Sequence, residues 1–153
     1  LDVNVDGIFF AVQHASADLL SKEEFLIFGK AYDQKLFPML DKFWLNLLHI
    51  HGINIYFDLL SDYPMQIVNW HDRETAPTLI DSSKLTEKAL CGGLSRIDTM
   101  VRGDEEIIRK QIDNALSNTR RSKFILGTGC VLPIVTPYGN IKYAIDYARS
   151  LTL

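Results

Sequence analysis

The stretch LLHIHG at residues 47–52 decides the fold, because an apolar run ends there in two histidines and a glycine. The surrounding run 44–52 is short and apolar, which is typical of a buried strand. Side chains two residues apart in a strand point to the same side, so His49 and His51 are expected to project together. Two adjacent imidazoles in a core are costly unless a partner binds them. The stretch therefore predicts a strand that ends in a polar site.

Strand-like and helix-like segments alternate along the rest of the chain. Further apolar stretches predict strands at 5–13, 65–70, 88–94 and 123–129. The third of these ends in Gly92-Gly93, which is expected to serve a tight turn or a close approach of the backbone to another element. Helical spacing predicts helices at 21–43, with a Ser21/Glu24 capping box, at 54–63, 104–119 and 138–151. The polar segment 71–86 holds at most a short helix. This alternation predicts a parallel sheet covered by helices.

A doubly wound sheet and a (β/α)8 TIM barrel both fit this pattern. No G-x-G-x-x-G motif follows the first strand, which counts against a dinucleotide-binding sheet. Polar or reactive side chains recur at the strand ends instead, where barrels build their active sites, at Gln13, His14, His49, His51, Asn69, Trp70, His71 and Cys130. We therefore predict an α/β fold, with about five C-terminal βα units of a barrel in a single domain over 1–153. Five strands cannot close a barrel, and the chain starts at Leu1 without Met, so we expect a piece of a longer protein.

Composition excludes several classes of protein. The 153 residues are 47% hydrophobic, with a formal net charge of −3. The sequence has no basic run, and so lacks the positively charged patch that indicates nucleic-acid binding. No apolar run approaches the roughly 20 residues of a membrane span. Cys91 and Cys130 are too few for a disulfide scaffold and suit a reducing compartment, so we expect a cytoplasmic location.

Five segments in this order resemble the uroporphyrinogen decarboxylase superfamily: DGIFF (6–10), HIHG (49–52), VNW (68–70), CGGL (91–94) and FILGTGCVLPIVTPYGNI (124–141). That superfamily includes the decarboxylases and the zinc-dependent methyltransferases that act with corrinoid proteins. The resemblance covers essentially the whole chain and matches the C-terminal part of the family's barrel. Decarboxylases carry Gly-His-Gly at the end of the last strand, whereas the methyltransferases carry Gly-Cys. Gly129-Cys130 therefore places the chain on the methyltransferase side.

The resemblance also implies a set of zinc ligands. The methyltransferases carry a His-x-Cys-Gly motif where this chain has HIHG, so His49 matches the ligand histidine and His51 stands at the cysteine position. A catalytic zinc takes three protein ligands and leaves the fourth position for substrate or water. The expected ligands are thus His49, His51 and Cys130. Methylcobalamin, free or on a corrinoid partner protein, and a small thiol acceptor would be the reactants.

Other residues near the strand ends have two interpretations each. Gln13, His14, Asn69 and Trp70 are candidates for substrate binding, although His14 suits an exposed loop and Trp70 a core position equally well. His71 lies in the polar loop WHDRE, where a solvated role is favoured. Cys91 is expected to be an apolar core residue and not a ligand. For the His49/His51 pair the alternative is two hydrogen-bonded polar groups at a strand end.

Three functions remain open on these grounds. The first is zinc-dependent methyl transfer between a corrinoid and a thiol or similar acceptor. The second is decarboxylation of a tetrapyrrole in porphyrin biosynthesis, ranked lower because Cys130 replaces the last-strand histidine and because the implied aspartate and arginines belong to the N-terminal part of the barrel. The third is an inactive barrel piece that pairs with another chain, either a second copy or the missing N-terminal half.

Overall fold

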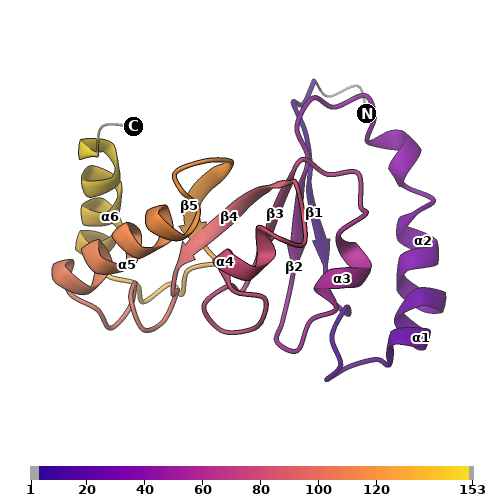
Figure 1. Cartoon of the computed structure of the whole chain (residues 1–153), viewed down its shortest axis with the longest axis horizontal. Helices are drawn as coiled ribbons and strands as arrows, with labels where there is room; N and C mark the ends of the chain where they lie inside the picture. The colour runs from indigo at the N-terminus through magenta and orange to yellow at the C-terminus, as the bar shows by residue number, and fades with distance from the viewer. Residues whose placement is uncertain (1–3, 152–153) are drawn as a thin grey trace.

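Five parallel strands form one sheet in the order of the sequence. The computed structural model describes residues 4–151. Every neighbouring pair in the order β1-β2-β3-β4-β5 is parallel (Figure 1). The strands are β1 (Phe9–Val12), β2 (Leu47–Ile50), β3 (Ile67–Trp70), β4 (Ala89–Leu94) and β5 (Phe124–Thr128). This arrangement, with helical connections, is the wall of a (β/α) barrel and confirms the predicted fold class. All five carboxyl ends consequently lie at one edge.

Helical segments connect the strands. They are α1 (Lys22–Phe25), the π-helix η1 (Leu26–Lys30), α2 (Ala31–Asp33), the 3₁₀ helix η2 (Phe37–Met39), α3 (Phe57–Leu60), α4 (Leu79–Ser82), α5 (Glu105–Asn118) and α6 (Tyr138–Ser150). The predicted capping box is present: the Ser21 hydroxyl accepts from the Glu24 amide at 3.2 Å, and the Glu24 carboxylate accepts from the Ser21 amide at 2.8 Å. α1, α2 and α3 lie toward the β1 end of the molecule, and α5 and α6 lie toward the β5 end (Figure 1).

Two predicted helices are shorter than the sequence pattern indicated. The segment 21–43 is helical to Asp33 and then passes through turns and η2, where Pro38 has no amide hydrogen to continue a helix. The segment 54–63 is helical only from Phe57, because Asn54 has φ +50°, outside the helical region. The spacing of apolar residues alone does not reveal either interruption of the helix.

Of the two roles predicted for Gly92-Gly93, the tight turn is wrong, because β4 continues through both glycines to Leu94, and the close approach is confirmed. A Cβ on Gly92 would lie 2.5 Å from Oδ1 of Asp72. Gly93 has φ +104°, and a Cβ there would lie 2.8 Å from the Cβ of Ala115 in α5. The glycines let the sheet approach α5 and the loop after β3, which is a packing role and not a turn.

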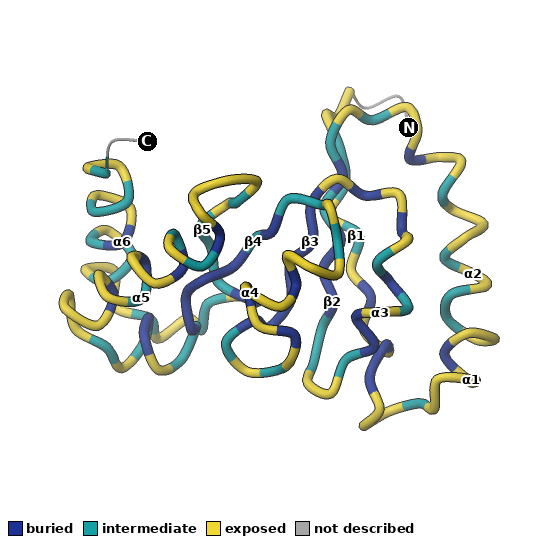
Figure 2. Tube along the Cα trace, in the orientation of Figure 1, coloured by how far each residue is buried: buried dark blue, intermediate teal, exposed yellow. Residues whose placement is uncertain are grey.

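The two faces of the sheet differ in what covers them. One face packs against the helices through buried residues of β2 and β3, which are dark in Figure 2: Leu48, Ile50, Val68 and Trp70. A second core joins α5 and α6 through Ile108, Ile112 and Ala144. The other face exposes 63% of Phe9 and 43% of Ile125. It is the face that carries the candidate site. None of the helices within residues 4–151 has the length and apolar character needed to cross a bilayer.

Candidate metal centre

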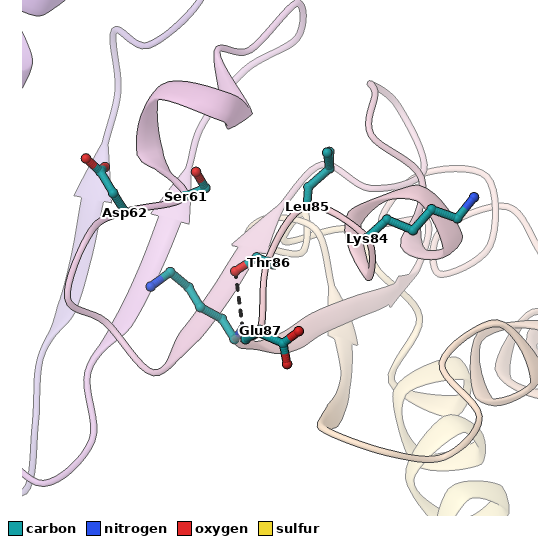
Figure 3. Close-up of a pocket in the computed structure, with 7 residues that line it drawn as sticks. Ser61, Asp62, Lys84, Leu85, Thr86 and Glu87 are labelled. Carbon is teal, nitrogen blue, oxygen red and sulfur yellow. Dashed lines mark hydrogen bonds between the residues drawn. The ribbon is translucent and has the colours of Figure 1, made fainter.

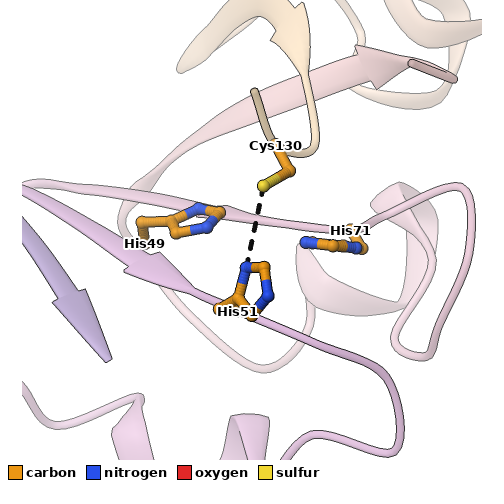
Figure 4. Close-up of side chains that lie close together, drawn as sticks. All are labelled: His49, His51, His71 and Cys130. Atoms are coloured by element: carbon orange, nitrogen blue, oxygen red, sulfur yellow. Dashed lines mark hydrogen bonds between the residues drawn. The ribbon is translucent and has the colours of Figure 1, made fainter. Parts of the chain in front are cut away.

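Four side chains meet at the carboxyl edge of the sheet (Figure 4). His49 lies in β2, and His51 comes just after its last residue. His71 directly follows β3, and Cys130 comes two residues after β5. One donor atom from each residue lies within 4.8 Å of the others. Parallel strands thus bring together groups that are far apart in the chain, such as His51 and Cys130, which are 79 residues apart.

The ring of His49 has a fixed orientation. Its Nδ1 atom lies 2.6 Å from Oδ1 of Asn69. The amide nitrogen of Asn69 donates to the carbonyls of Cys91 at 2.9 Å and Thr128 at 3.1 Å, so its oxygen must be the atom that faces His49. The imidazole therefore donates from Nδ1 and keeps the Nε2 lone pair for another partner. Burial lowers the pKa of His49, although the Asn69 hydrogen bond opposes it, and this favours the neutral form that binds metals.

His71 is buried on the far side of the cluster, so the predicted solvated role is wrong. The backbone turns back at this point, and the amides of Glu74 and Thr75 both donate to the His71 carbonyl, at 2.8 and 2.9 Å. Nδ1 of His71 lies 3.3 Å from Oε2 of Glu74, and Nε of Arg96 lies 3.0 Å from Oε1 of the same carboxylate. Burial lowers the pKa of His71 in spite of Glu74.

The Nε2 atom of His71 is buried and meets no hydrogen-bond partner within the described part of the chain. Leaving a buried polar nitrogen unpaired costs about 1–3 kcal/mol. A metal ion held by the cluster would satisfy this nitrogen. The orphaned atom is therefore an independent sign that the cluster is a binding site.

His51 and Cys130 face one another. Nδ1 of His51 lies 3.7 Å from the Cys130 sulfur, close to the about 3.6 Å that separates nitrogen and sulfur on a tetrahedral zinc with ordinary bond lengths. β2 stops at Ile50 and Gly52 has φ +99°, so His51 is not part of the strand, but its ring still lies 5.9 Å from that of His49. Three imidazoles and one thiol are donors that zinc prefers. The cluster fits that ion.

A pocket of about 490 Å³ opens on three of these donors, His49, His51 and Cys130. Its other lining residues are Phe9, Ala11, Gln13, Leu47, Asn69, Cys91, Gly127, Thr128 and Val131. Gln13 and Asn69 thus lie at the pocket. His14 does not: it is exposed and lines a separate hollow beside Phe28 and Tyr32.

Trp70 does not line the pocket either, contrary to the expectation from its position at a strand end. Its side chain is fully buried on the helical face, and its indole N–H donates to the carbonyl of Pro77 at 2.9 Å. Neighbouring residues of a strand point to opposite faces, so Asn69 at the pocket places Trp70 in the core.

A second hollow, of about 520 Å³, lies at the amino-terminal ends of the strands (Figure 3). Its lining comes from the ends of α3 and α4 and from Lys88, which directly precedes β4: Ser61, Asp62, Lys84, Leu85, Thr86, Glu87 and Lys88. It belongs to the edge opposite the histidine cluster and contains none of its donors. This second hollow is therefore no part of the candidate metal centre.

Comparison with known proteins gives two matches of different kinds. The family model described as uroporphyrinogen decarboxylase (URO-D) matches residues 2–151. Among solved structures, a methyltransferase from Methanosarcina mazei superposes with a TM-score of 0.76 at 22% sequence identity. The match covers 93% of this chain and 42% of that one, so the chain spans less than half of the methyltransferase. No curated protein matches by sequence.

Proposed function

The chain belongs to the uroporphyrinogen decarboxylase family, and from this membership we propose that it carries the zinc centre of a methyltransferase. The reaction would move a methyl group between a corrinoid, methylcobalamin or its protein-bound form, and a thiol or similar acceptor. One observation carries the proposal: the donor atoms of His49, His51, His71 and Cys130 lie within 4.8 Å of one another beside an open pocket.

Neighbouring side chains fix which ring nitrogen of the two buried histidines, His49 and His71, is free to bind a metal. Asn69 and Glu74 hold the Nδ1 atoms of His49 and His71, so that Nε2 of each ring is free to bind. Zinc bound here would hold a coordinated thiol as the thiolate that methyl transfer from a corrinoid requires. The pocket beside the donors has apolar walls from Phe9, Ala11, Leu47 and Val131, which suit a small apolar group.

The open face of the sheet supports a larger assembly. Within the described residues β1 and β5 each pair with one neighbour only, and Phe9 and Ile125 are exposed beside the pocket. Unpaired parallel edges are ready to pair with further strands. We propose that additional strands, from an N-terminal barrel half or a second copy, close this face and complete the corrinoid site. Two free cysteines suit the cytoplasm as its location.

Decarboxylation of a tetrapyrrole is the second candidate, favoured by the description of the matching family model. The donor set weighs against it. Burial favours neutral His49 and His71, and three imidazoles with a thiol suit a metal better than the carboxylates of a tetrapyrrole. A folded but inactive barrel piece is the third candidate, and it predicts neither metal nor turnover.

The test combines metal analysis with turnover. The protein, purified from metal-replete medium, is expected to hold one zinc ion per chain and to demethylate methylcobalamin in the presence of a small thiol, followed by the corrinoid absorbance. Cys130→Ala and His49→Ala should lose zinc, whereas Cys91→Ala, whose thiol is outside the cluster, should keep it. An absence of zinc in the wild type, or full zinc in both ligand variants, would contradict the proposal. Consumption of uroporphyrinogen would favour the decarboxylase.

A further inference from the structure

We propose that His51 is the donor that an incoming thiol replaces, while His49, His71 and Cys130 hold the metal throughout. This inference rests on the proposed function. Four protein donors on a tetrahedral zinc make a closed structural site, whereas a catalytic site keeps one position for substrate. The cluster brings four donors together, so one of them must give way for the acceptor to bind.

Two of the three histidines have the support that permanent ligands show. A metal-binding histidine almost always donates its other ring N–H to a carboxylate, carbonyl or water, and losing that partner costs about 10–100-fold in affinity. His49 donates to Asn69, whose amide is itself anchored on β4 and β5. His71 donates to Glu74, which Arg96 holds with two contacts, at 3.0 and 3.4 Å. Both rings are therefore locked.

His51 has no such support among the described residues. The one ring nitrogen with a hydrogen-bonding contact is Nδ1, and that contact is the Cys130 sulfur at 3.7 Å. Its backbone amide donates to the Val12 carbonyl at 3.0 Å, but the following residue, Gly52, leaves the strand with φ +99°. The backbone is held, while the ring, within residues 4–151, contacts only other members of the cluster, the His49 ring at 5.9 Å, the His71 ring at 5.1 Å and the Cys130 sulfur.

Access from the pocket points to the same residue. A thiol that enters the pocket meets His49, His51 and Cys130, but not His71, which is 3% exposed and lies behind them. His49 is locked by Asn69. Cys130 is the anionic donor, and the Thr128 hydroxyl, which donates to its backbone carbonyl at 2.7 Å, fixes the chain there but not the sulfur. Of the three, His51 is the neutral donor that a thiol can reach and whose ring no described residue outside the cluster locks by a hydrogen bond.

The ligands can be counted by X-ray absorption fine structure at the zinc edge, with 2-mercaptoethanol as the probe thiol. The wild type should change from three imidazoles and one sulfur to two imidazoles and two sulfurs when the thiol is added. His51→Ala should show two imidazoles with and without thiol, and should bind zinc within about tenfold of the wild type. His71→Ala should weaken binding by about 100-fold or more. His14→Ala, which removes the histidine outside the cluster, should match the wild type.

Several outcomes would overturn the exchange at His51. Retention of three imidazoles when the thiol binds would do so, as would loss of an imidazole on thiol addition in His51→Ala. The exchange would also be overturned if His71→Ala, in place of His51→Ala, kept zinc affinity within about tenfold of the wild type and showed two imidazoles with and without thiol. If His71→Ala does not fold, Glu74→Gln is used in its place and should weaken zinc binding by about tenfold. Unchanged zinc binding in Glu74→Gln would contradict the claim that Glu74 locks His71 as a permanent ligand. A wild type that binds no zinc would instead refute the proposed function itself.

Discussion

The Nδ1 atom of His49 lies 2.6 Å from the Oδ1 atom of Asn69, and this amide ties the His49 ring to the neighbouring strands. The nitrogen of Asn69 donates to the carbonyls of Cys91 in β4 and Thr128 in β5. Asn69 itself is 5% exposed in β3. The residue therefore joins four strands through buried hydrogen bonds, and its loss should affect both metal affinity and fold stability.

Asn69→Leu should lower metal affinity by about 10–100-fold, because the His49 ring loses the partner that fixes its tautomer. It should also lower the free energy of unfolding by about 1–3 kcal/mol, because two buried carbonyls lose a donor. Asn69→Asp keeps an acceptor for His49 but not the donors, so it should lose stability while retaining more of the affinity. Zinc titration and denaturant unfolding measure the two effects. The exposed Asn4→Leu is the control, and unchanged affinity in Asn69→Leu would contradict the assigned role.

Glu74 should affect metal affinity much more than stability. Its side chain is 31% exposed, as a surface ion pair with Arg96, and such pairs contribute only about 0–1 kcal/mol to folding. Glu74→Ala removes the acceptor for His71 and should weaken zinc binding by about 10–100-fold in a chelator competition. The matched control is Glu87→Ala, which breaks the exposed pair with Lys123. Equal affinities in the two variants would show that Glu74 does not orient His71.

The strand order and most of the donors could be predicted from the sequence. Alternating apolar and amphipathic segments determine a parallel sheet, and a parallel sheet collects whatever follows its strands at one edge. His49, His51 and Cys130 meet there for that reason. The prediction depended on local patterns, which the sequence displays directly, and on the rule that parallel strands place their carboxyl ends at one edge.

The place of His71 at a strand end could be predicted in the same way, but its burial could not. Its neighbours, in the segment HDRE, are polar and indicate a solvated loop. Its burial depends on Glu74 and Arg96, which belong to different loops and are 22 residues apart. Gly92 and Gly93 are a similar case: a glycine pair indicates either a turn or a close approach, and the contacts with Asp72 and Ala115 of other elements decide for the second. Contacts between segments decided both features, and no local pattern encodes them.

Trp70→Phe should destabilise the fold without disturbing the metal. The indole N–H donates to the Pro77 carbonyl, and the ring packs edge-on against Phe57 at 5.1 Å. Losing the buried hydrogen bond and part of the ring should lower the free energy of unfolding by about 1–3 kcal/mol. Zinc stoichiometry and thiol binding should be unchanged, as measured by metal analysis and titration. A stable variant with impaired thiol binding would show that Trp70 contributes to the pocket after all.

The two cysteines should differ in reactivity, and the difference should depend on pH and on zinc. Burial, with a smaller contribution from the charge of Asp72, raises the pKa of the Cys91 thiol to about 11. A raised pKa means less thiolate at every lower pH, so at pH 8 only about one Cys91 in a thousand is ionised, and this fraction rises about tenfold per pH unit until the pKa is reached. Alkylation of Cys91 by iodoacetamide should therefore be slow at pH 8 and accelerate steeply toward pH 11, while zinc has no effect on it.

Cys130 faces the pocket and the donor cluster, so the metal-free protein should be alkylated there and zinc should protect it. Peptide mass spectrometry assigns each site, and Cys91→Ser and Cys130→Ser verify the assignment. Protection of Cys91 by zinc, or alkylation of Cys130 at the same rate with and without zinc, would show that the sulfur donor has been assigned to the wrong strand.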